Sequence, residues 1–258
     1  MRLDYHMHTA FSDGNSEMAR YVDGAAKKGI NEIGFSDHFH LRKEAWSMDP
    51  KRLNNYVEAI GSFKQTSPIP VKTGLEVEFV PDRVETLMQA IRHFDFDYLM
   101  GSVHYIGDWL IDSKSAMEEW VRRDVDQVYE QYFDLVQTMA RTELFDIVGH
   151  LDLVKIFNFR PRNDLDDLLL ETVQTISKSG MCIEINTSGL RKPCREIYPS
   201  EKLLKMCFDN GLPITFGSDA HLPEDVGADF DKAVDLVTRV GYDEIVRFTR
   251  RRREFVQF

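Results

Sequence analysis

Cysteine is scarce in this sequence, and the few cysteines present do not suggest a site. Three cysteines occur among 258 residues, and none stands in a CxxC pair. Cys182 lies in an apolar run and Cys207 in a helical pattern, which is typical of small core residues in a reducing compartment. We therefore expect neither a disulfide framework nor a cysteine–zinc site.

Long apolar runs and a leader-like N-terminus are also missing. No stretch approaches the roughly 20 apolar residues that a membrane helix requires. The first residues run directly into a strand-like pattern, without the apolar segment of a signal peptide. These features predict a cytoplasmic protein with no membrane partner. The glycine-rich Walker and GxGxxG loops are absent too, as is a GxSxG nucleophile motif.

Basic residues are outnumbered by acidic ones, 32 to 43, which gives a formal net charge of −11. Such a surface repels polyanions, so we expect no nucleic-acid partner. Acidic residues that bind divalent cations would reduce the excess. The one basic run, residues 250–253, has the spacing of a solvated helix face, and the segment from Tyr242 onward is predicted to be a helix. Whether that helix packs on the domain or mediates association stays open, as does the oligomeric state.

Short apolar runs alternate with longer helical patterns along the chain. The runs cover residues 2–6, 32–36, 71–77, 98–103, 145–149, 181–186 and 213–217. They are rich in branched and aromatic residues and are bounded by turn or helix signals, as buried strands are. The longest helical pattern spans residues 116–142, with an apolar stripe that begins at Val121. Repeated strand–helix units predict an α/β fold with parallel strands, a barrel of seven strands in a single domain over residues 1–258.

Seven of the eight histidines lie at or just beyond the C-terminal end of a predicted strand. Barrel enzymes place their active sites on that face. His6 and His8 are two residues apart in a strand, so their side chains point to the same side. The eighth histidine, His93, is expected to be a surface or packing residue. Asp37 and Asp152 fit either the site or a helix N-cap, and Glu78 shares the face of Glu76.

Imidazoles and carboxylates crowded on one concave face are costly unless a cation balances them. One histidine at a strand end is usually an ordinary polar residue, so the prediction depends on the whole group. Nitrogen and oxygen donors without thiolates suit zinc, manganese or iron. The donors outnumber those that one ion needs, which predicts a cluster of two or three divalent metal ions. Clusters of this kind typically carry out hydrolysis, with a bridging hydroxide that attacks a clamped phosphoryl group.

The motifs at these strand ends resemble those of the polymerase-and-histidinol-phosphatase (PHP) superfamily. They are HMHTAFSDG (6–14), SDH (36–38), GLE (74–76), SVH (102–104), GHLD (149–152) and GSDAH (217–221). The resemblance implies a distorted (β/α)7 TIM-like barrel with a trinuclear metal site. The implied ligand sets are His6, His8, Glu76 and Asp219 for one ion, His104, His150 and the shared Glu76 for a second, and Asp13, His38 and His221 for a third. Some relatives have histidine in place of Asp13, and an oxygen ligand there favours manganese or iron.

Three longer stretches look most like the monofunctional histidinol-phosphatases. They are SVHYIGDW (102–109), GHLDLVK (149–155) and EINTSGLRK (184–192). This resemblance implies hydrolysis of L-histidinol phosphate to L-histidinol and phosphate, a step of histidine biosynthesis, by a metal-bound hydroxide. Glu76 would act at the metals, and Asp219 or His221 is a candidate acid that protonates the leaving group.

The substrate contacts are less sharply defined. Arg160 and Arg191 follow predicted strands on the catalytic face, and guanidinium groups match phosphate oxygens, so both are predicted phosphate binders, with Lys192 as the alternate. His40 is predicted either to support the ligands or to contact substrate. Trp109 and acidic loop residues are candidates for recognising the imidazole and amino groups.

Two other hypotheses stay open at this point. The same metal site fits another small phosphomonoester, a nucleotide or a nucleic-acid end. A barrel that keeps the metals only for structure, without catalysis, is the other alternative.

Overall fold

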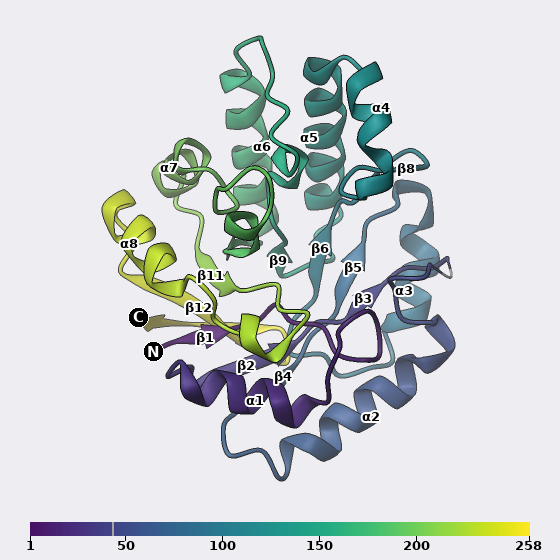
Figure 1. Ribbon diagram of the computed structural model, residues 1–258, viewed down its shortest axis with the longest axis vertical. Coiled ribbons are helices and arrows are strands. Elements are labelled where there is room, and N and C mark those ends of the chain that lie inside the picture. The colour runs from purple at the N-terminus through teal and green to yellow at the C-terminus, as the bar shows by residue number, and fades with distance from the viewer. Residues whose placement is uncertain (43) are drawn as a thin grey trace.

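Parallel strands form the centre of the molecule, and helices lie around them (Figure 1). The computed structural model describes residues 1–42 and 44–258. The central strands are β1 (Leu3–Asp4), β2 (Glu32–Phe35), β3 (His38–Phe39), β4 (Val71–Thr73), β5 (Glu76–Glu78), β6 (Met100–Ser102), β9 (Ile147–Val148), β10 (Cys182–Asn186) and β11 (Ile214–Gly217). They pair in parallel in the orders β1-β2-β4 and β11-β10-β9-β6-β5-β3.

The two sheets join into a closed barrel. Two residues separate β2 from β3 and β4 from β5, and the Gly74 N–H bridges these breaks by donating to the Phe35 carbonyl at 2.8 Å. On the other side, the Tyr5 N–H donates to the Phe216 carbonyl at 3.0 Å and ties β1 to β11. All seven predicted strand runs are therefore present. The predicted α/β barrel is confirmed, and the two breaks are distortions of a regular barrel.

The helices cover the outside of the barrel, as the crossovers between parallel strands require. They are α1 (Met18–Lys27), α2 (Leu53–Lys64), α3 (Val84–Ile91), α4 (Met117–Arg122), α5 (Val125–Arg141), α6 (Asp166–Ser179), α7 (Glu201–Asp209) and α8 (Phe230–Val240). Short 3-10 turns are η1 (Pro50–Arg52), η2 (Pro81–Arg83), η3 (Lys114–Ala116), η4 (Leu153–Lys155), η5 (Ser188–Arg191) and η6 (Pro223–Asp225). No helix within residues 1–42 and 44–258 has both the length and the apolar character to cross a bilayer.

The prediction of a single helix over residues 116–142 is wrong in one respect, because this stretch forms two helices, α4 and α5. Asp124 occupies the break and caps α5 by accepting hydrogen bonds from the N–H groups of Asp126 at 2.9 Å and Gln127 at 3.3 Å. Val121, the expected start of the apolar stripe, lies on α4 and is 75% exposed. The apolar pattern alone suggested one continuous helix, but the N-cap aspartate starts a second helix within that stretch.

The predicted C-terminal helix is also wrong. The segment forms an antiparallel hairpin of β12 (Glu244–Thr249) and β13 (Arg252–Gln257), in which Arg250 and Arg251 make the turn with positive φ of 49° and 62°. The hairpin packs against the N-terminal ends of the barrel strands: the Phe248 N–H donates to the Tyr5 hydroxyl at 3.2 Å. It therefore closes the end of the barrel that is opposite to the strand ends carrying the histidines.

Tyrosine fills the barrel interior above this hairpin. The rings of Tyr5 and Tyr98 stack with centroids 4.9 Å apart, and both are fully buried. Gly34 and Gly74 make room for Tyr98, because a Cβ atom at either position would lie within 2.3 Å of a Tyr98 side-chain atom. Aromatic rings thus fill the half of the barrel next to the hairpin, and the histidines gather at the opposite mouth.

Candidate metal centre

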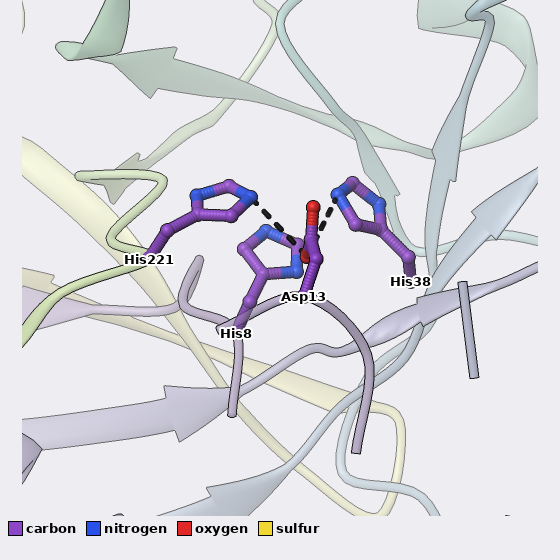
Figure 2. A group of neighbouring side chains, drawn as sticks. All are labelled: His8, Asp13, His38 and His221. Atoms are coloured by element: carbon purple, nitrogen blue, oxygen red, sulfur yellow. Dashed lines mark ion pairs between the residues drawn. The ribbon is translucent and has the colours of Figure 1, made fainter. Parts of the chain in front are cut away.

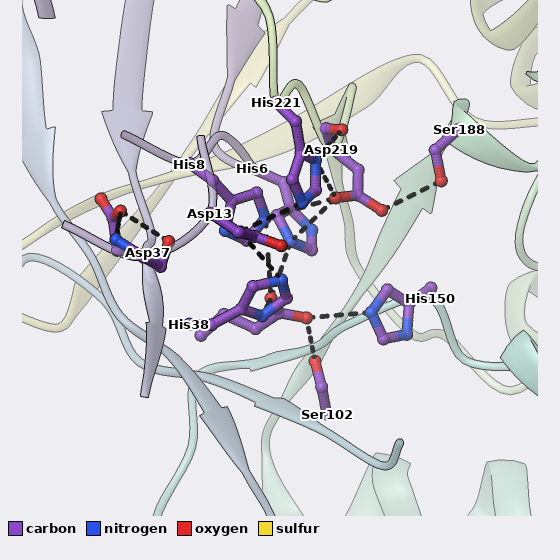
Figure 3. Close-up of polar contacts among 12 residues, drawn as sticks. His6, His8, Asp13, Asp37, His38, Ser102, His150, Ser188, Asp219 and His221 are labelled. Carbon is purple, nitrogen blue, oxygen red and sulfur yellow. Dashed lines mark hydrogen bonds and ion pairs between the residues drawn. The ribbon is translucent and has the colours of Figure 1, made fainter. Parts of the chain in front are cut away.

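The structure brings all nine predicted ligand residues together at the C-terminal mouth of the barrel. Figure 3 labels His6, His8, Asp13, His38, His150, Asp219 and His221 among them. His38 and Glu76 begin the short strands β3 and β5, and the other donors lie in the segments that follow β1, β6, β9 and β11. Four overlapping groups have donor atoms within 4.8 Å of one another: His8, Asp13, His38 and His221; His6, His150 and Asp219; His6, His8 and Glu76; and His38, Glu76 and His104. Donors separated along the chain by more than 200 residues therefore share one small volume.

Glu76 lies at the centre of the cluster. Its Oε2 atom is 2.6 Å from His38 Nδ1 and 3.2 Å from His6 Nε2, while its Oε1 atom is 2.9 Å from His150 Nε2. The Ser102 hydroxyl donates to the same Oε1 atom at 2.8 Å (Figure 3). Burial opposes ionisation of Glu76, but His38 and His6 outweigh it and hold the pKa of the carboxyl well below its usual value. Both carboxylate oxygens thus face imidazole nitrogens, as a bridging ligand requires.

His8, Asp13, His38 and His221 form an outer group at the cavity side (Figure 2). The Asp13 Oδ1 atom lies 3.4 Å from His221 Nε2 and 3.8 Å from His38 Nε2. These separations leave room between the donors. The group offers three imidazoles and one carboxylate, a set that suits zinc, manganese or iron.

Several donor atoms in the cluster are buried without a hydrogen-bond partner. Within the described ranges, these are His6 Nε2, both nitrogens of His8, His38 Nδ1, Glu76 Oε2 and His150 Nδ1. His38 and Glu76 approach to 2.6 Å, yet neither atom has hydrogen-bond geometry with the other. Each orphaned buried polar atom is costly, and a coordinated cation removes that cost. The donor set and its orphaned atoms therefore fit divalent metal ions.

Two glutamates hold the histidine rings from behind. Glu184 Oε1 accepts from His6 Nδ1 at 2.6 Å, and Glu78 Oε2 accepts from His104 Nδ1 at 2.6 Å. Hydrogen bonds of this kind fix the tautomer, so that Nε2 stays free to bind a metal. The sequence pattern places Glu78 on the face of Glu76 but predicts a supporting role for neither glutamate. The available signal was an acidic residue inside the apolar run 181–186, where alternation points Glu184 to the same side as Asn186.

The histidines divide into two electrostatic classes. Burial lowers the pKa of His6, but Glu184, Glu76 and Asp219 outweigh it and raise the pKa well above its usual value. Burial also lowers the pKa of His104, but the charge of Glu78 and its hydrogen bond outweigh it and raise the pKa to about 10. His8 differs, because burial and the neighbouring His38 and His221 lower its pKa to about 3. Without metal, some imidazoles of the cluster therefore carry protons, and a metal ion would have to displace these protons on binding.

Asp37 shapes the loop that presents Asp13. Its carboxylate accepts hydrogen bonds from the N–H groups of Thr9 at 2.8 Å and Ser12 at 3.0 Å, and from the Ser12 hydroxyl at 2.7 Å. Gly14 closes the loop, since a Cβ atom there would lie 1.9 Å from the His8 carbonyl oxygen. Asp37 is therefore neither a helix cap nor a grouped donor. Asp152 likewise makes no cap bond to the turn that follows it and accepts from the Ser200 N–H at 2.9 Å.

Two residues of the cluster have strained backbone conformations. His150 has φ of 22° and Asp219 has φ of 54°, which non-glycine residues rarely adopt. The His150 N–H donates to Glu184 Oε2 at 2.7 Å, and the Ser188 hydroxyl donates to Asp219 Oδ2 at 3.0 Å (Figure 3). Surrounding contacts thus hold both residues in place, as is common at functional sites.

A cavity of about 320 Å³ opens beside the donors. Apart from His38, His104, His150, His221, Asp13 and Asp219, it is lined by Trp46, Leu110, Asp112, Ser113, Leu153, Ile156, Ser188 and Lys192. Sequence reasoning anticipated Lys192 but not Trp46, Asp112 or Ser113. The cavity joins the donor cluster to a wall with both apolar and charged side chains.

The other predicted substrate contacts lie away from this lining. The Arg160 guanidinium pairs with Glu196 at 2.9 Å, and Arg191 donates to the Ser218 carbonyl at 2.7 Å. His40 is buried and stacks on Tyr105, with ring centroids 5.8 Å apart. Trp109 packs on Trp120 with ring centroids 5.0 Å apart. As expected, His93 lies on the surface.

Comparisons with known proteins agree with this geometry. The model of the PHP domain family matches residues 4–188. A probable histidinol-phosphatase of Deinococcus radiodurans is 33% identical over 92% of this chain and 93% of its own length. The histidinol-phosphatase of Lactococcus lactis is 27% identical over 96% of this chain and 94% of its own. A crystal structure of histidinol phosphate phosphatase from Lactococcus lactis, complexed with zinc, L-histidinol and phosphate, superposes with a TM-score of 0.85 at 24% identity, covering 98% of both chains.

Proposed function

The chain belongs to the PHP domain family, and on that basis we propose that it is a metal-dependent phosphatase that hydrolyses L-histidinol phosphate to L-histidinol and inorganic phosphate. The observation that carries the proposal is the cluster of nine nitrogen and oxygen donors beside a cavity of about 320 Å³. That volume suits a small molecule and lies at the C-terminal mouth of the barrel, where barrel enzymes work. The relatives that match this chain over nearly its whole length are named for the same reaction.

We assign the metal ligands to the nine grouped residues: His6, His8, Asp13, His38, Glu76, His104, His150, Asp219 and His221. Glu76 is the proposed bridge, because its two oxygens face different histidines. When bound, divalent ions at such a site neutralise phosphoryl oxygens and activate water for attack on phosphorus. Glu184 and Glu78 keep two of the histidine rings in the ligating orientation.

The leaving alcohol requires a proton, and the candidates lie at the cavity. His221 and Asp219 both line it. Burial lowers the pKa of His221, but the contact with Asp13 and the charge of Asp219 raise it to about 9, so this imidazole holds a proton at neutral pH in the absence of metal. The Ser188 hydroxyl orients the Asp219 carboxylate from the other side. Burial raises the pKa of Asp219, but His6 and His8 outweigh it and hold the pKa well below its usual value, so of the two candidates we favour His221 as the acid.

Lys192 is the favoured phosphate contact among the substrate residues. It is the only lysine or arginine in the cavity lining among residues 1–42 and 44–258. The charges of Arg160 and Arg191 face acidic partners instead: Glu196 at 2.9 Å and Asp225 at 3.7 Å. Phosphate contact by either arginine would require it to exchange that partner for substrate, so we place Lys192 first.

The test is phosphate release from L-histidinol phosphate with zinc or manganese supplied, beside sugar phosphates, nucleotides and a phosphodiester. We expect strong preference for L-histidinol phosphate, and loss of turnover on chelation at temperatures where circular dichroism still reports a folded chain. Equal or greater activity on the nucleotides or the diester would overturn the substrate assignment. Full activity after chelation, with metal content measured as zero, would overturn the metal-dependent mechanism.

A further inference from the structure

Asp112 is a carboxylate at the cavity wall that the metal cluster does not use. It lies between β8 (Trp109–Leu110) and η3, and it is half-buried. The other two aspartates of the lining, Asp13 and Asp219, face histidines at 3.4 Å and 3.2 Å. Asp112 makes no hydrogen bond or ion pair with the part of the chain that the structure describes. Its charge is therefore available to a molecule in the cavity.

The residue before Asp112, Ile111, has both its backbone N–H and its backbone carbonyl in hydrogen bonds. The Ile111 N–H donates to the His104 carbonyl at 2.9 Å, and the Ile111 carbonyl accepts from the Trp120 indole at 2.8 Å. Ile111 is fully buried, and the Ser113 hydroxyl caps the next turn at Ser115. A carboxylate on such a support is held in place before a ligand arrives, which reduces the entropy cost of binding.

A supporting role for Asp112 within the metal cluster is already filled by other residues. The two ring nitrogens of His104 face Glu78 at 2.6 Å and Glu76 at 3.6 Å, so neither needs Asp112 as a partner. Asp112 acts on His104 only as a nearby negative charge. The carboxylate instead shares the cavity wall with Trp46 and Leu110. This combination of one anion and an apolar surface matches an organic cation of small size.

We propose that Asp112 binds the primary ammonium group of the substrate and selects phosphate esters of amino alcohols over esters without the amine. The inference rests on the proposed hydrolysis of L-histidinol phosphate, whose ammonium group sits on the carbon next to the one that bears the ester. With the phosphate at the metal cluster, the ammonium needs an acceptor on the adjoining wall. Asp112 is the unpaired carboxylate there.

The experiment compares D112N with D108N in the metal-loaded enzyme. Asp108 is a matched control, since it lies on the same segment but is 89% exposed and pairs with Arg42 at 3.1 Å. The substrates are L-histidinol phosphate and its deaminated analogue, 3-(imidazol-4-yl)propyl phosphate. A site that binds a polar group of its substrate rejects an analogue lacking it, by roughly tenfold or more. We expect D112N to raise KM for L-histidinol phosphate about tenfold with little change in kcat, and to leave the analogue unaffected.

Other outcomes would overturn the inference. Equal losses on both substrates, or reduced metal content in D112N, would indicate a structural role, and unchanged kinetics on both would indicate no role. A second pair, 2-aminoethyl phosphate and ethyl phosphate, separates this inference from the proposed function. If the wild type fails on L-histidinol phosphate, the proposed function falls. The inference then stands only if the wild type prefers the aminoethyl ester and D112N loses that preference.

Discussion

The carboxylate of Glu184 lies 2.6 Å from Nδ1 of His6, on the side of the imidazole away from the donor cluster. The opposite ring nitrogen, Nε2, lies 3.2 Å from Glu76 Oε2 and has no hydrogen-bond partner among the described residues. The second oxygen of Glu184 receives the His150 N–H at 2.7 Å. One buried glutamate therefore orients two neighbouring donors of the metal centre.

The variant E184Q should weaken metal binding without unfolding the chain. An amide is a poorer acceptor than a carboxylate and leaves His6 less basic, and losses of this kind cost roughly 10–100-fold in metal affinity. Competition with a chelator, read by metal content, measures the effect. E171Q on α6 makes the same charge change at a site 65% exposed and should match wild type. Wild-type affinity in E184Q would show that Glu184 does not support the metals.

The variant E76Q should abolish phosphate release. Glu76 contributes both oxygens to the cluster, and loss of a bridging carboxylate removes several kcal/mol of transition-state stabilisation, or roughly 10³-fold in kcat/KM. Steady-state kinetics with added zinc or manganese provides the measurement, and circular dichroism confirms the fold. More than a few per cent of wild-type activity would rule out Glu76 as the bridge.

The variant G217A should reduce stability and metal binding together. A Cβ atom at Gly217 would lie 1.9 Å from Glu184 Oε1 and 2.7 Å from His6 Cβ, so one of these side chains must move. Overpacking of this kind costs about 1–3 kcal/mol. G61A in α2 is the control, because nothing lies within 4 Å of a Cβ there, and it should gain up to about 1 kcal/mol. Thermal melts and metal content test both variants, and an unchanged G217A would contradict the packing argument.

The variant D97N should destabilise the fold at neutral pH and much less in acid. Burial raises the pKa of Asp97, but hydrogen bonds from Lys64 Nζ and the N–H groups of Thr73 and Arg250 outweigh it and set the pKa below its usual value. Such a group stabilises the fold above its unfolded pKa of about 3.9, and the contribution is lost as pH falls through the lower folded pKa. We expect a loss of about 1–3 kcal/mol at pH 7.

Urea unfolding of wild type and D97N from pH 7 down to pH 3 measures this difference. The two free energies of unfolding should converge as the pH falls. D231N serves as the control, since Asp231 is 85% exposed and pairs with the exposed Arg2, and an exposed pair contributes little. A gap that stays constant over the whole range would show that the charge of Asp97 is not the source of the stability.

The strands and the histidines that follow them could be predicted from one physical rule, whereas the full set of nine donors came from the family resemblance. Buried parallel strands require short apolar runs, and a polar residue at the end of such a run, as at His104 or His150, stands out against them. Of the supporting glutamates, Glu78 follows the run 71–77 and stood out only as sharing the face of Glu76, whereas Glu184 was missed because it lies within a run. Glu184 is fully buried inside β10, and its charge is balanced only by residues that fold next to it.

The C-terminal hairpin could not be predicted from its local sequence. Its turn uses positive φ at Arg250 and Arg251, where hairpins usually have glycine or asparagine. Distant residues hold that turn: Arg250 N–H donates to Asp97 Oδ1 at 3.1 Å, and the Arg251 guanidinium pairs with Asp146 at 2.8 Å. Tertiary contacts thus override the helical spacing of the arginine run. The cavity lining could not be predicted for a similar reason: Trp46 lines the cavity, whereas Trp109 on β8 packs against Trp120, and tertiary contacts decide both placements.

The hairpin under the barrel also sets the order in which the chain can mature during synthesis. Two partners of Tyr5, Phe216 and Phe248, are made more than 200 residues after it. Until then the first strand has neither its neighbour β11 nor its cover, and its apolar side chains stay available to other chains. Contacts so distant in sequence close slowly. The metal site, which needs Asp219 and His221, should therefore be completed only after nearly the whole chain has been made.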